Sequence, residues 1–353
     1  MTWYSNPAAR AWQAPPRPDD AAAPATVRDF HRSLPGYSPT PLHDAPELAA
    51  ELGVASVLVK DESHRLGMGA FKILGASWAA RRALVGHPGA TLVSATDGNH
   101  GRAVARTARD LGVPARIVVP AVMDDATRAR IAAEGAEVAA VDGDYDEAVR
   151  TAASFAAAAP DRVLVQDTAW PGYEQVPQWI VDGYATLTAE IDEALGRRPD
   201  LIVVPSGVGS LAQAVVAHYR APAARNEGAA HQATRVLVVD PDTAACTVES
   251  LVAGAPTTVP TEATVMAGLN CGTLSALAWP VLRDGCDAAV TVTDDAALRA
   301  VADLGALGIS SGPSGAATLA GLRAALTDPG RRADLDLPDD AVVVLLSTEG
   351  AQP

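Results

Sequence analysis

Short runs of β-branched residues alternate along this chain with alanine-rich stretches of helical length. The apolar runs lie at 57–60, 91–95, 115–120, 136–141, 162–167, 201–206, 235–240, 289–292 and 341–347. The stretches expected to be helical include 70–85, 99–111, 124–134, 144–158, 174–196 and 209–220. Strict alternation of strand and helix predicts parallel strands joined by crossover helices, which is an α/β fold.

Small and polar residues follow several of these predicted strands. They form the segments KDES, ATDGNHG, QDTAW, PSGVGS and LLSTEG. In an open parallel sheet, ligands bind at the carboxyl ends of the strands. We therefore expect the functional residues of the chain to lie in these segments.

Composition excludes several kinds of partner. The formal net charge is −15 and no basic stripe appears, whereas nucleic-acid binding depends on clustered Lys and Arg. Cys246, Cys271 and Cys286 are odd in number and far apart, which indicates neither a disulfide framework nor a metal site and fits a reducing compartment. No apolar stretch reaches the length of a signal peptide core or a membrane span, so we expect a soluble cytoplasmic protein.

Lysine is rare in this chain. Only Lys60 and Lys72 are lysines among 27 basic side chains, and both lie in one short segment. A Schiff base with an aldehyde needs a primary amine that can lose its proton, which arginine cannot supply. Lys72 is therefore a candidate nucleophile. On this feature alone, the chance loss of lysine from an alanine- and arginine-rich chain explains the pattern equally well.

A glycine-containing turn follows the predicted strand 201–206. Gly207, Val208, Gly209 and Ser210 precede a helix, and backbone amides at the start of a helix can cradle a phosphate. The spacing also satisfies the GxGxxA pattern of dinucleotide-binding proteins, with Asp240 at the end of the next strand. A purely structural tight turn is the third interpretation.

A second turn, TDGNHG, lies between the strand 91–95 and the helix 99–111. The amides of Gly98 and Asn99 would face an anion, for which a substrate carboxylate is the natural guest. Taken by itself, Asp97 could equally serve as a helix cap. The functional interpretation is favoured because a lysine and a phosphate cradle accompany the turn.

Together these motifs resemble the fold type II pyridoxal-phosphate enzymes. Within that group, PGYSPTPL, KDES, AFKILGAS, ATDGNHGRAVA, QDTAWPGYEQVPQWIVDGYATL, PSGVGS, MAGLNCGT and LLSTEG are similar to segments of the diaminopropionate ammonia-lyases. The resemblance implies a two-domain α/β fold of open, twisted, mainly parallel sheets flanked by helices. It implies an N-terminal arm at 1–36, a large domain of 37–79 and 175–353, and a small domain of 80–174. Pyridoxal 5'-phosphate would lie in the cleft between the domains of a homodimer.

The resemblance also implies roles for individual residues. Lys72, next to Phe71, would hold the cofactor through a Schiff base, and Asn99 would bond its phenolic oxygen. The turn from Gly207 through Val208 and Gly209 to Ser210 would bind its phosphate. Ser347 would meet its pyridine nitrogen.

Asp97 and Asp167 would be the acid/base pair, one on each side of the substrate. Desolvation in a closed site would raise the pKa of such a carboxyl from about 3.9 toward that of a useful base. The residues implied to contact the substrate are Thr96, Asp97, Gly98, Asn99, Trp170 and Tyr173. His100 is expected to pack against the turn.

The implied reaction is the α,β-elimination of ammonia from 2,3-diaminopropionate, giving pyruvate and ammonia. Pro313 stands where relatives carry a glutamate. If this change removes a charge that anchors the distal amine, the chain would be a serine or threonine dehydratase or a β-replacement enzyme acting on a modified amino acid. Outside the enzymes, the alternative is a nucleotide-binding protein that uses the GVGS loop.

Overall fold

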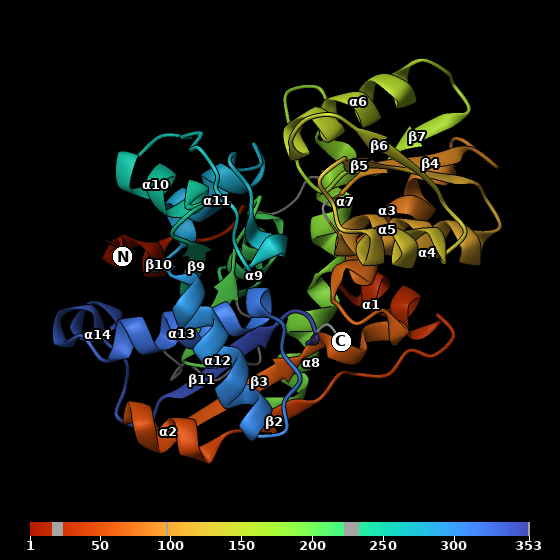
Figure 1. Cartoon of the computed structure of the whole chain (residues 1–353). Helices are drawn as coiled ribbons and strands as arrows, with labels where there is room; N and C mark the ends of the chain where they lie inside the picture. The colour runs from red at the N-terminus through yellow and green to blue at the C-terminus, as the bar shows by residue number, and fades with distance from the viewer. Residues whose placement is uncertain (16–23, 97, 222–232, 352–353) are drawn as a thin grey trace.

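The strands of the molecule form two separate sheets, which Figure 1 shows with helices around each. The structure is a computed structural model and describes residues 1–15, 24–96, 98–221 and 233–351. The smaller sheet lies at the upper right of Figure 1, and the larger one occupies the left and lower parts. This arrangement confirms the predicted α/β class.

The larger sheet has seven strands in the order β1-β10-β9-β8-β11-β3-β2. Its strands are β1 Trp3–Ser5, β2 Leu42–Asp44, β3 Ser56–Asp61, β8 Leu201–Pro205, β9 Arg235–Pro241, β10 Ala288–Val292 and β11 Val342–Ser347. The five inner strands pair in parallel, and the two short edge strands pair antiparallel to their neighbours. The sheet is therefore open and mainly parallel. Its short edges limit pairing with another chain.

The smaller sheet is wholly parallel, with the order β6-β5-β4-β7. Its strands are β4 Thr91–Ala95, β5 Ala115–Pro120, β6 Glu137–Val141 and β7 Arg162–Leu164. All four lie within the range 80–174 that the sequence assigns to a small domain. The domain boundaries themselves remain a prediction.

Helices cover both faces of the larger sheet and both faces of the smaller one. The helices are α1 Pro24–Arg32, α2 Pro46–Leu52, α3 Lys72–Leu84, α4 Asn99–Leu111, α5 Asp125–Ala132, α6 Tyr145–Ala157, α7 Gln175–Gly183, α8 Ala185–Leu195, α9 Ser210–Tyr219, α10 Cys246–Ala253, α11 Ala278–Gly285, α12 Asp294–Ala306, α13 Pro313–Leu326 and α14 Pro329–Leu335. Short 3-10 helices lie at η1 Pro7–Ala11, η3 Glu62–Gly67 and η4 Ala267–Leu269.

The larger sheet separates two apolar layers because side chains alternate along each strand. Along β11, Val343 and Leu345 pack in the layer formed with α12 and α13. Val344 and Leu346 pack on the opposite side, in the layer that contains residues of α3, α7 and α9. Burial on both faces explains why these strands are continuous apolar runs in the sequence.

Two glycines bring α3 and α7 into close contact. A Cβ atom at Gly75 would lie 2.7 Å from side-chain atoms of Ile180 and Tyr184, and one at Gly183 would lie 2.5 Å from the carbonyl oxygen of Leu74. Any larger side chain at either position would push the helices apart. The contact fixes the first turn of α3, where Lys72 is the first residue.

Several elements differ from the sequence-based expectation. The stretch 174–196 forms two helices, α7 and α8, which meet at Tyr184. The arm predicted at 1–36 is not a loose appendage where it is described, because β1 joins the larger sheet and α1 packs against α3 and α8. The three-residue edge strands of the larger sheet, β1 and β2, were not predicted, since three residues are too few to show a periodic pattern.

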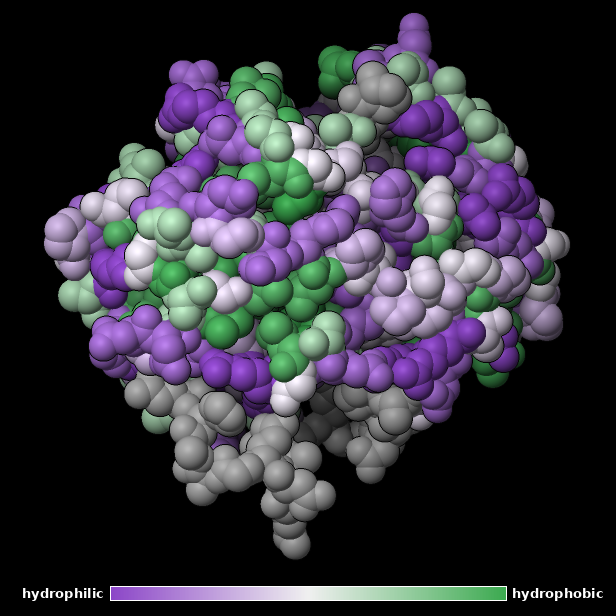
Figure 2. Space-filling model, turned by 90° about the horizontal axis from the view of Figure 1, so that it is seen from below, coloured by the Kyte–Doolittle hydropathy of each residue, from purple (hydrophilic) through white to green (hydrophobic). Residues whose placement is uncertain are grey.

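The surface in Figure 2 carries hydrophilic residues spread among hydrophobic ones. Exposed large apolar side chains such as Val85, Leu111 and Val122 lie singly on different elements. None of the helices among the described residues is long and apolar enough to cross a membrane.

Candidate active site

One cavity collects side chains from the carboxyl ends of strands in both sheets. The space between its walls, including the part open to solvent, is about 740 Å³. Its walls come from the start of α3, the β4–α4 and β8–α9 turns, the segment after β7 and the segment after β11. The lining residues are Phe71, Lys72, Thr96, Asn99, His100, Tyr145, Asp167, Pro205, Ser206, Gly207, Val208, Gly209, Ser210, Leu211, Gly268, Leu269, Cys271, Ser314, Thr348 and Glu349.

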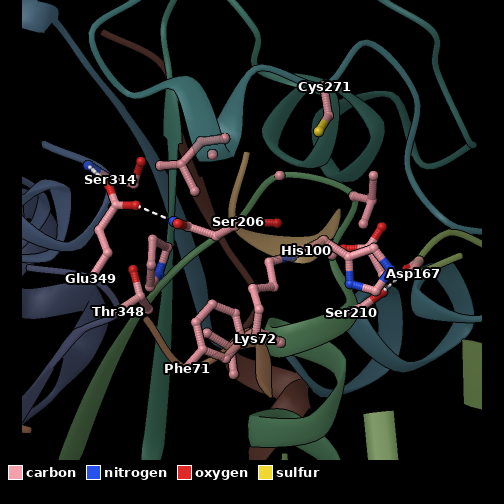
Figure 3. A pocket seen from close by; sticks show the side chains of 18 of the residues that line it. Phe71, Lys72, His100, Asp167, Ser206, Ser210, Cys271, Ser314, Thr348 and Glu349 are labelled. Atoms are coloured by element: carbon pink, nitrogen blue, oxygen red, sulfur yellow. Dashed lines mark hydrogen bonds and ion pairs between the residues drawn. The ribbon is translucent and has the colours of Figure 1, made fainter. Parts of the chain in front are cut away.

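Lys72 lies at the centre of the cavity, with Asp167 and His100 to one side (Figure 3). Lys72 Nζ donates to Asp167 Oδ2 over 2.7 Å. His100 Nδ1 lies 3.7 Å from the same carboxylate oxygen, while His100 Nε2 lies 2.9 Å from the carbonyl oxygen of Val165. Since a carbonyl only accepts, Nε2 carries the ring proton of a neutral His100, and Nδ1 faces the cavity as an acceptor.

The three groups shift one another's pKa. Burial favours the neutral form of Lys72, but the charge of Asp167 more than offsets this and holds the lysine pKa above its usual value. Burial would likewise raise the pKa of Asp167, yet the electrostatic influence of His100 and Lys72 lowers it to about 2. Burial lowers the pKa of His100. The resting site therefore holds an ammonium–carboxylate pair beside a neutral imidazole.

The turn after β8 packs closely against the segment 268–274. Gly209 has φ +87°, and a Cβ atom there would lie 2.6 Å from Leu274 Cδ1. A Cβ atom at Gly207 would lie 3.1 Å from the carbonyl oxygen of Gly268. Glycine at these positions lets the backbone line the cavity directly, and α9 begins at the next residue, Ser210. The free amides of its first turn point to an anion as the guest.

Two hydroxyl groups join this turn to the Asp167 segment. Ser210 Oγ donates to the carbonyl oxygen of Asp167 over 2.6 Å. The amide of Ala169 donates to Ser275 Oγ over 3.0 Å, and the amide of Ser275 donates to the carbonyl oxygen of Val208 over 2.9 Å. The anion cradle and the segment that carries Asp167 are therefore held as one unit.

The turn before α4 lies on the other wall. Thr96 Oγ1 accepts from the amides of Gly98 and Gly101, over 2.9 and 3.0 Å, so Thr96 caps the helix. Thr96 and Asn99 line the cavity, whereas Gly98 lines an adjoining one. Asp97, the other predicted acid/base residue, lies outside the described residues.

Glu349 is the main residue that sequence reasoning missed. It follows Thr348 on the segment after β11 and is 8 % exposed. Asn99 Nδ2 donates to its Oε2 over 2.6 Å, as the dashed line in Figure 3 marks. The signal was present in the LLSTEG segment, but only the serine there was considered. His100 was expected only to pack against the turn, and its approach to Asp167 could not be predicted because the two residues are far apart in the sequence.

Besides Gly98, three predicted residues lie outside the set that lines the cavity. Ser347 is fully buried beneath Thr348, and its hydroxyl donates to Ser311 Oγ over 2.8 Å. Trp170 and Tyr173 stack on each other with their ring centroids 4.5 Å apart. The Tyr173 hydroxyl bridges backbone groups of the segment before Asp167, accepting from one amide and donating to one carbonyl, each over 2.9 Å. Contacts of these three residues with cofactor or substrate remain predictions.

Asp240 does not serve the dinucleotide alternative. It is fully buried at the end of β9, and its Oδ2 accepts from the amides of Thr247 and Val248 at the start of α10, over 2.8 and 3.0 Å. A dinucleotide site needs this carboxylate free to bind a ribose hydroxyl. The glycine turn therefore lacks the partner that a nucleotide would require.

A lysine in a cavity beside a glycine turn, on a two-sheet α/β frame, defines the class of enzymes that bind an aldehyde cofactor carrying a phosphate. The family model described as pyridoxal-phosphate dependent enzyme matches residues 34–349. The chain belongs to this family of pyridoxal-phosphate dependent enzymes.

Among curated proteins, the diaminopropionate ammonia-lyase of Salmonella typhimurium is 34% identical over 362 residues, which cover 92% of this chain and 88% of that protein. The enzyme of the same name from Escherichia coli is 36% identical over 355 residues, covering 92% and 87%. An L-threonine dehydratase of Mycobacterium leprae is 30% identical and covers 85% of this chain and 67% of its own length.

Solved structures agree with these relatives. The crystal structure of the Escherichia coli diaminopropionate ammonia-lyase with an aminoacrylate-PLP azomethine reaction intermediate has a TM-score of 0.85 and 34% sequence identity, covering 99% of this chain and 93% of that one. The same enzyme in complex with D-serine has a TM-score of 0.85 at 33% identity and the same coverage. The fold is that of the fold type II pyridoxal-phosphate enzymes.

The residues present fit pyridoxal phosphate. Lys72 supplies the amine that an aldehyde requires, and the glycine turn with the start of α9 supplies a cradle that a side chain at Gly207 would narrow. Asn99 lines the space between them with a polar amide. The cofactor assignment therefore rests on the geometry of this cavity as well as on the family.

Proposed function

We propose that this protein catalyses the α,β-elimination of ammonia from 2,3-diaminopropionate, with release of pyruvate and ammonia. The observation that carries the proposal is the Lys72–Asp167 pair at 2.7 Å inside the cavity, in a chain 34–36% identical to diaminopropionate ammonia-lyases over nearly all of its length. An amine for the cofactor and a carboxylate for proton transfer thus meet at one point.

Lys72 would hold the cofactor, the turn from Gly207 to Ser210 would hold its phosphate, and Asn99 would bond its phenolic oxygen. When bound, pyridoxal phosphate supplies an electron sink that makes the α-proton of an amino acid acidic. Once the substrate amine displaces Lys72, the freed lysine and Asp167 share the task of moving a proton at the α-carbon. Asp97 is the proposed partner on the opposite side.

The environment of Asp167 changes during this sequence. In the resting protein its charge is paired with Lys72, which makes it a weak base. With Lys72 held by the cofactor, its ammonium would no longer pair with Asp167, and the carboxylate would regain basicity. His100 Nδ1 lies 3.7 Å from this carboxylate and makes no hydrogen bond to it.

Dehydration of serine or threonine is the second candidate, because a threonine dehydratase is also a relative and the Escherichia coli ammonia-lyase has been crystallised with D-serine. The match spans 87–88% of the length of the ammonia-lyases but only 67% of the threonine dehydratase. Diaminopropionate is therefore the first candidate substrate.

A panel of D- and L-2,3-diaminopropionate, serine and threonine tests the proposal. The purified holoenzyme is assayed for 2-oxo acid and for ammonia. Diaminopropionate should give two ammonia per pyruvate, because one nitrogen leaves in elimination and the second in hydrolysis of aminoacrylate, whereas serine gives one. Turnover of serine alone would identify a dehydratase. Cofactor absorbance changes without any 2-oxo acid would indicate β-replacement.

Three further features belong to this proposal. We propose a homodimer and a cytoplasmic location, which the family resemblance and the spacing of the cysteines support. The division into an arm, a large domain and a small domain at the predicted boundaries is likewise proposed. Sedimentation at several protein concentrations measures the first, and limited proteolysis locates the last.

A further inference from the structure

Glu349 lies where two cavities adjoin. It lines the Lys72 cavity and also an outer cavity between α4–α5 and the segment near Pro313, and Asn99 is shared in the same way. In Figure 3 it stands on the opposite side of Lys72 from Asp167, next to Ser314 and Thr348. A small molecule passing from the outer cavity to Lys72 would therefore meet this carboxyl group.

The carboxyl group of Glu349 is held in place by neutral donors. Oε2 accepts from Asn99 Nδ2 over 2.6 Å, and Oε1 accepts from the amide of Ser314 over 3.3 Å. The hydroxyl of Ser314 is buried in the same wall and, together with the Ser314 amide, helps to lower the pKa of Glu349. These donors carry no charge, so they hydrogen-bond the carboxyl group without neutralising it.

No cation pairs with Glu349 in the part of the chain that the structure describes. The ammonium of Lys72 is engaged by Asp167 at 2.7 Å and exerts only a minor influence on Glu349. Burial raises the pKa of Glu349, although the hydrogen bonds from Ser314 and Asn99 oppose this. Buried carboxylates are normally paired with a positive charge. The missing charge points to a cationic guest.

The neighbouring glycine shows that this wall is built around the carboxyl group. A Cβ atom at Gly312 would lie 2.9 Å from Glu349 Oε1 and 3.0 Å from its Cγ. Glu349 thus fills the space that a side chain at position 312 would need. Pro313 carries no charge, but Glu349 brings a carboxyl group to the same cavity from the segment after β11.

We propose that Glu349 binds the distal ammonium of the substrate and so makes the site select a 2,3-diamino acid over its hydroxy analogue. The inference rests on the proposed function, since serine and diaminopropionate differ only at this group. Asp167 cannot take the same role in the resting site, because its charge is paired with Lys72.

The chemistry of the leaving group determines which kinetic constant responds. In elimination the β-carbon–nitrogen bond breaks, both electrons go to nitrogen, and the ammonium leaves as neutral ammonia without donating a proton. The positive charge that Glu349 holds is present in the bound substrate and during removal of the α-proton, and it disappears only as the carbon–nitrogen bond breaks. An interaction that is equally strong in the ground state and in the transition state for α-proton removal changes KM and leaves kcat unchanged.

The test compares holoenzyme carrying Glu349→Gln with wild type, using diaminopropionate and serine as matched substrates. A hydrogen bond to a charged group contributes about 1.5–3 kcal/mol, so KM for diaminopropionate should rise about 10- to 100-fold while kcat changes little. The constants for serine should stay within about twofold. Glu137→Gln makes the same chemical change at an exposed position on β6 and should alter neither substrate.

A spectral titration of the bound cofactor measures affinity for each substrate without turnover. A Glu349→Gln protein that loses affinity for diaminopropionate and serine equally would overturn the inference and make Glu349 a residue that only orients Asn99. A Glu349→Gln protein with wild-type affinity for both substrates would overturn it as well. Wild-type protein that binds diaminopropionate but forms no pyruvate would refute the proposed function, while the affinity ratio would still test Glu349.

Discussion

Two buried carboxyl groups face the same cavity from opposite walls, and they differ in one respect. Asp167 has an ammonium partner at 2.7 Å, and its pKa falls to about 2. Glu349 has only neutral donors, and burial raises its pKa. The pKa of the same functional group is thus lowered on one wall by an ammonium partner and raised on the other by burial.

The difference shows how one site can separate two tasks. A carboxylate already paired with Lys72 becomes available as a base only after the lysine is engaged elsewhere, which ties its activity to a bound substrate. A carboxyl group without a cation is completed by a positively charged guest, which makes it a recognition group. The experiments below test this separation.

The largest effect is expected for Lys72→Ala. Removing the amine should abolish turnover and the absorbance of lysine-bound cofactor, because the chain then has no primary amine in the cavity. It also removes the cation beside Asp167, so the pKa of Asp167 should rise from about 2. The visible spectrum and an NMR titration of the carboxyl carbons measure both. Covalent cofactor and turnover in this variant would refute the role of Lys72.

Asp167→Asn should lower kcat for elimination by about 10²–10⁴-fold, which is the usual contribution of a positioned acid or base. The lysine-bound cofactor spectrum should persist, because Lys72 is intact. Single-turnover kinetics with α-deuterated substrate should show a larger isotope effect than wild type. A variant with the wild-type rate would mean that Asp167 only pairs with Lys72.

The pH dependence of stability should have opposite signs for the two carboxyl groups in cofactor-free protein. Asp167 has a lowered pKa, so its contribution is present above about 3.8 and is lost as pH falls toward about 2, a change of roughly 2 kcal/mol. Glu349 has a raised pKa, so its contribution is present below 4.5 and is lost as pH rises through the raised value. Urea unfolding of wild type, Asp167→Asn and Glu349→Gln over pH 2–8 measures both slopes. If the two carboxyl groups changed the free energy of unfolding in the same direction as pH rises, the proposed difference between Asp167 and Glu349 would be wrong.

Gly312→Ala should have the smallest effect. The new methyl group would press on Glu349 Oε1 and on the carbonyl oxygen of Gly350, each 2.9 Å from the ideal Cβ position. Displacement of the carboxyl group should lower kcat/KM for diaminopropionate about tenfold, or about 1.4 kcal/mol, with less change for serine. Equal losses for both substrates would indicate a general distortion of the wall.

Much of the frame was predictable because it depends on local patterns. The apolar run 91–95 and the helical stretch 99–111 were predicted with the bounds of β4 and α4, since buried parallel strands and amphipathic helices carry strong periodicity. The edge strands β1 and β2 were not, because their pairing depends on contacts distant in sequence. Helix α7 ends at Gly183, where the close approach of Leu74 determines the geometry.

Site residues that lie in a recognisable sequence motif could be predicted. Residues whose role depends on contacts across the cavity could not. Lys72, Asn99 and the turn at Gly207 could be found from segments that follow strands. Glu349 also follows a strand, but its role could not be predicted because its partners Asn99 and Ser314 are supplied by different elements. Ser347 was placed by analogy, while strand alternation turns its hydroxyl toward Ser311.

The hydroxyl of Ser210 and that of Ser275 tie the anion cradle to the stretch that follows β7. Because the two segments are hydrogen-bonded to each other, an anion bound at the turn after β8 should also restrict the motion of the segment that carries Asp167. Inorganic phosphate alone should then slow hydrogen exchange at the amides around Asp167 before any aldehyde is present. The site would assemble from its anion-binding end inward.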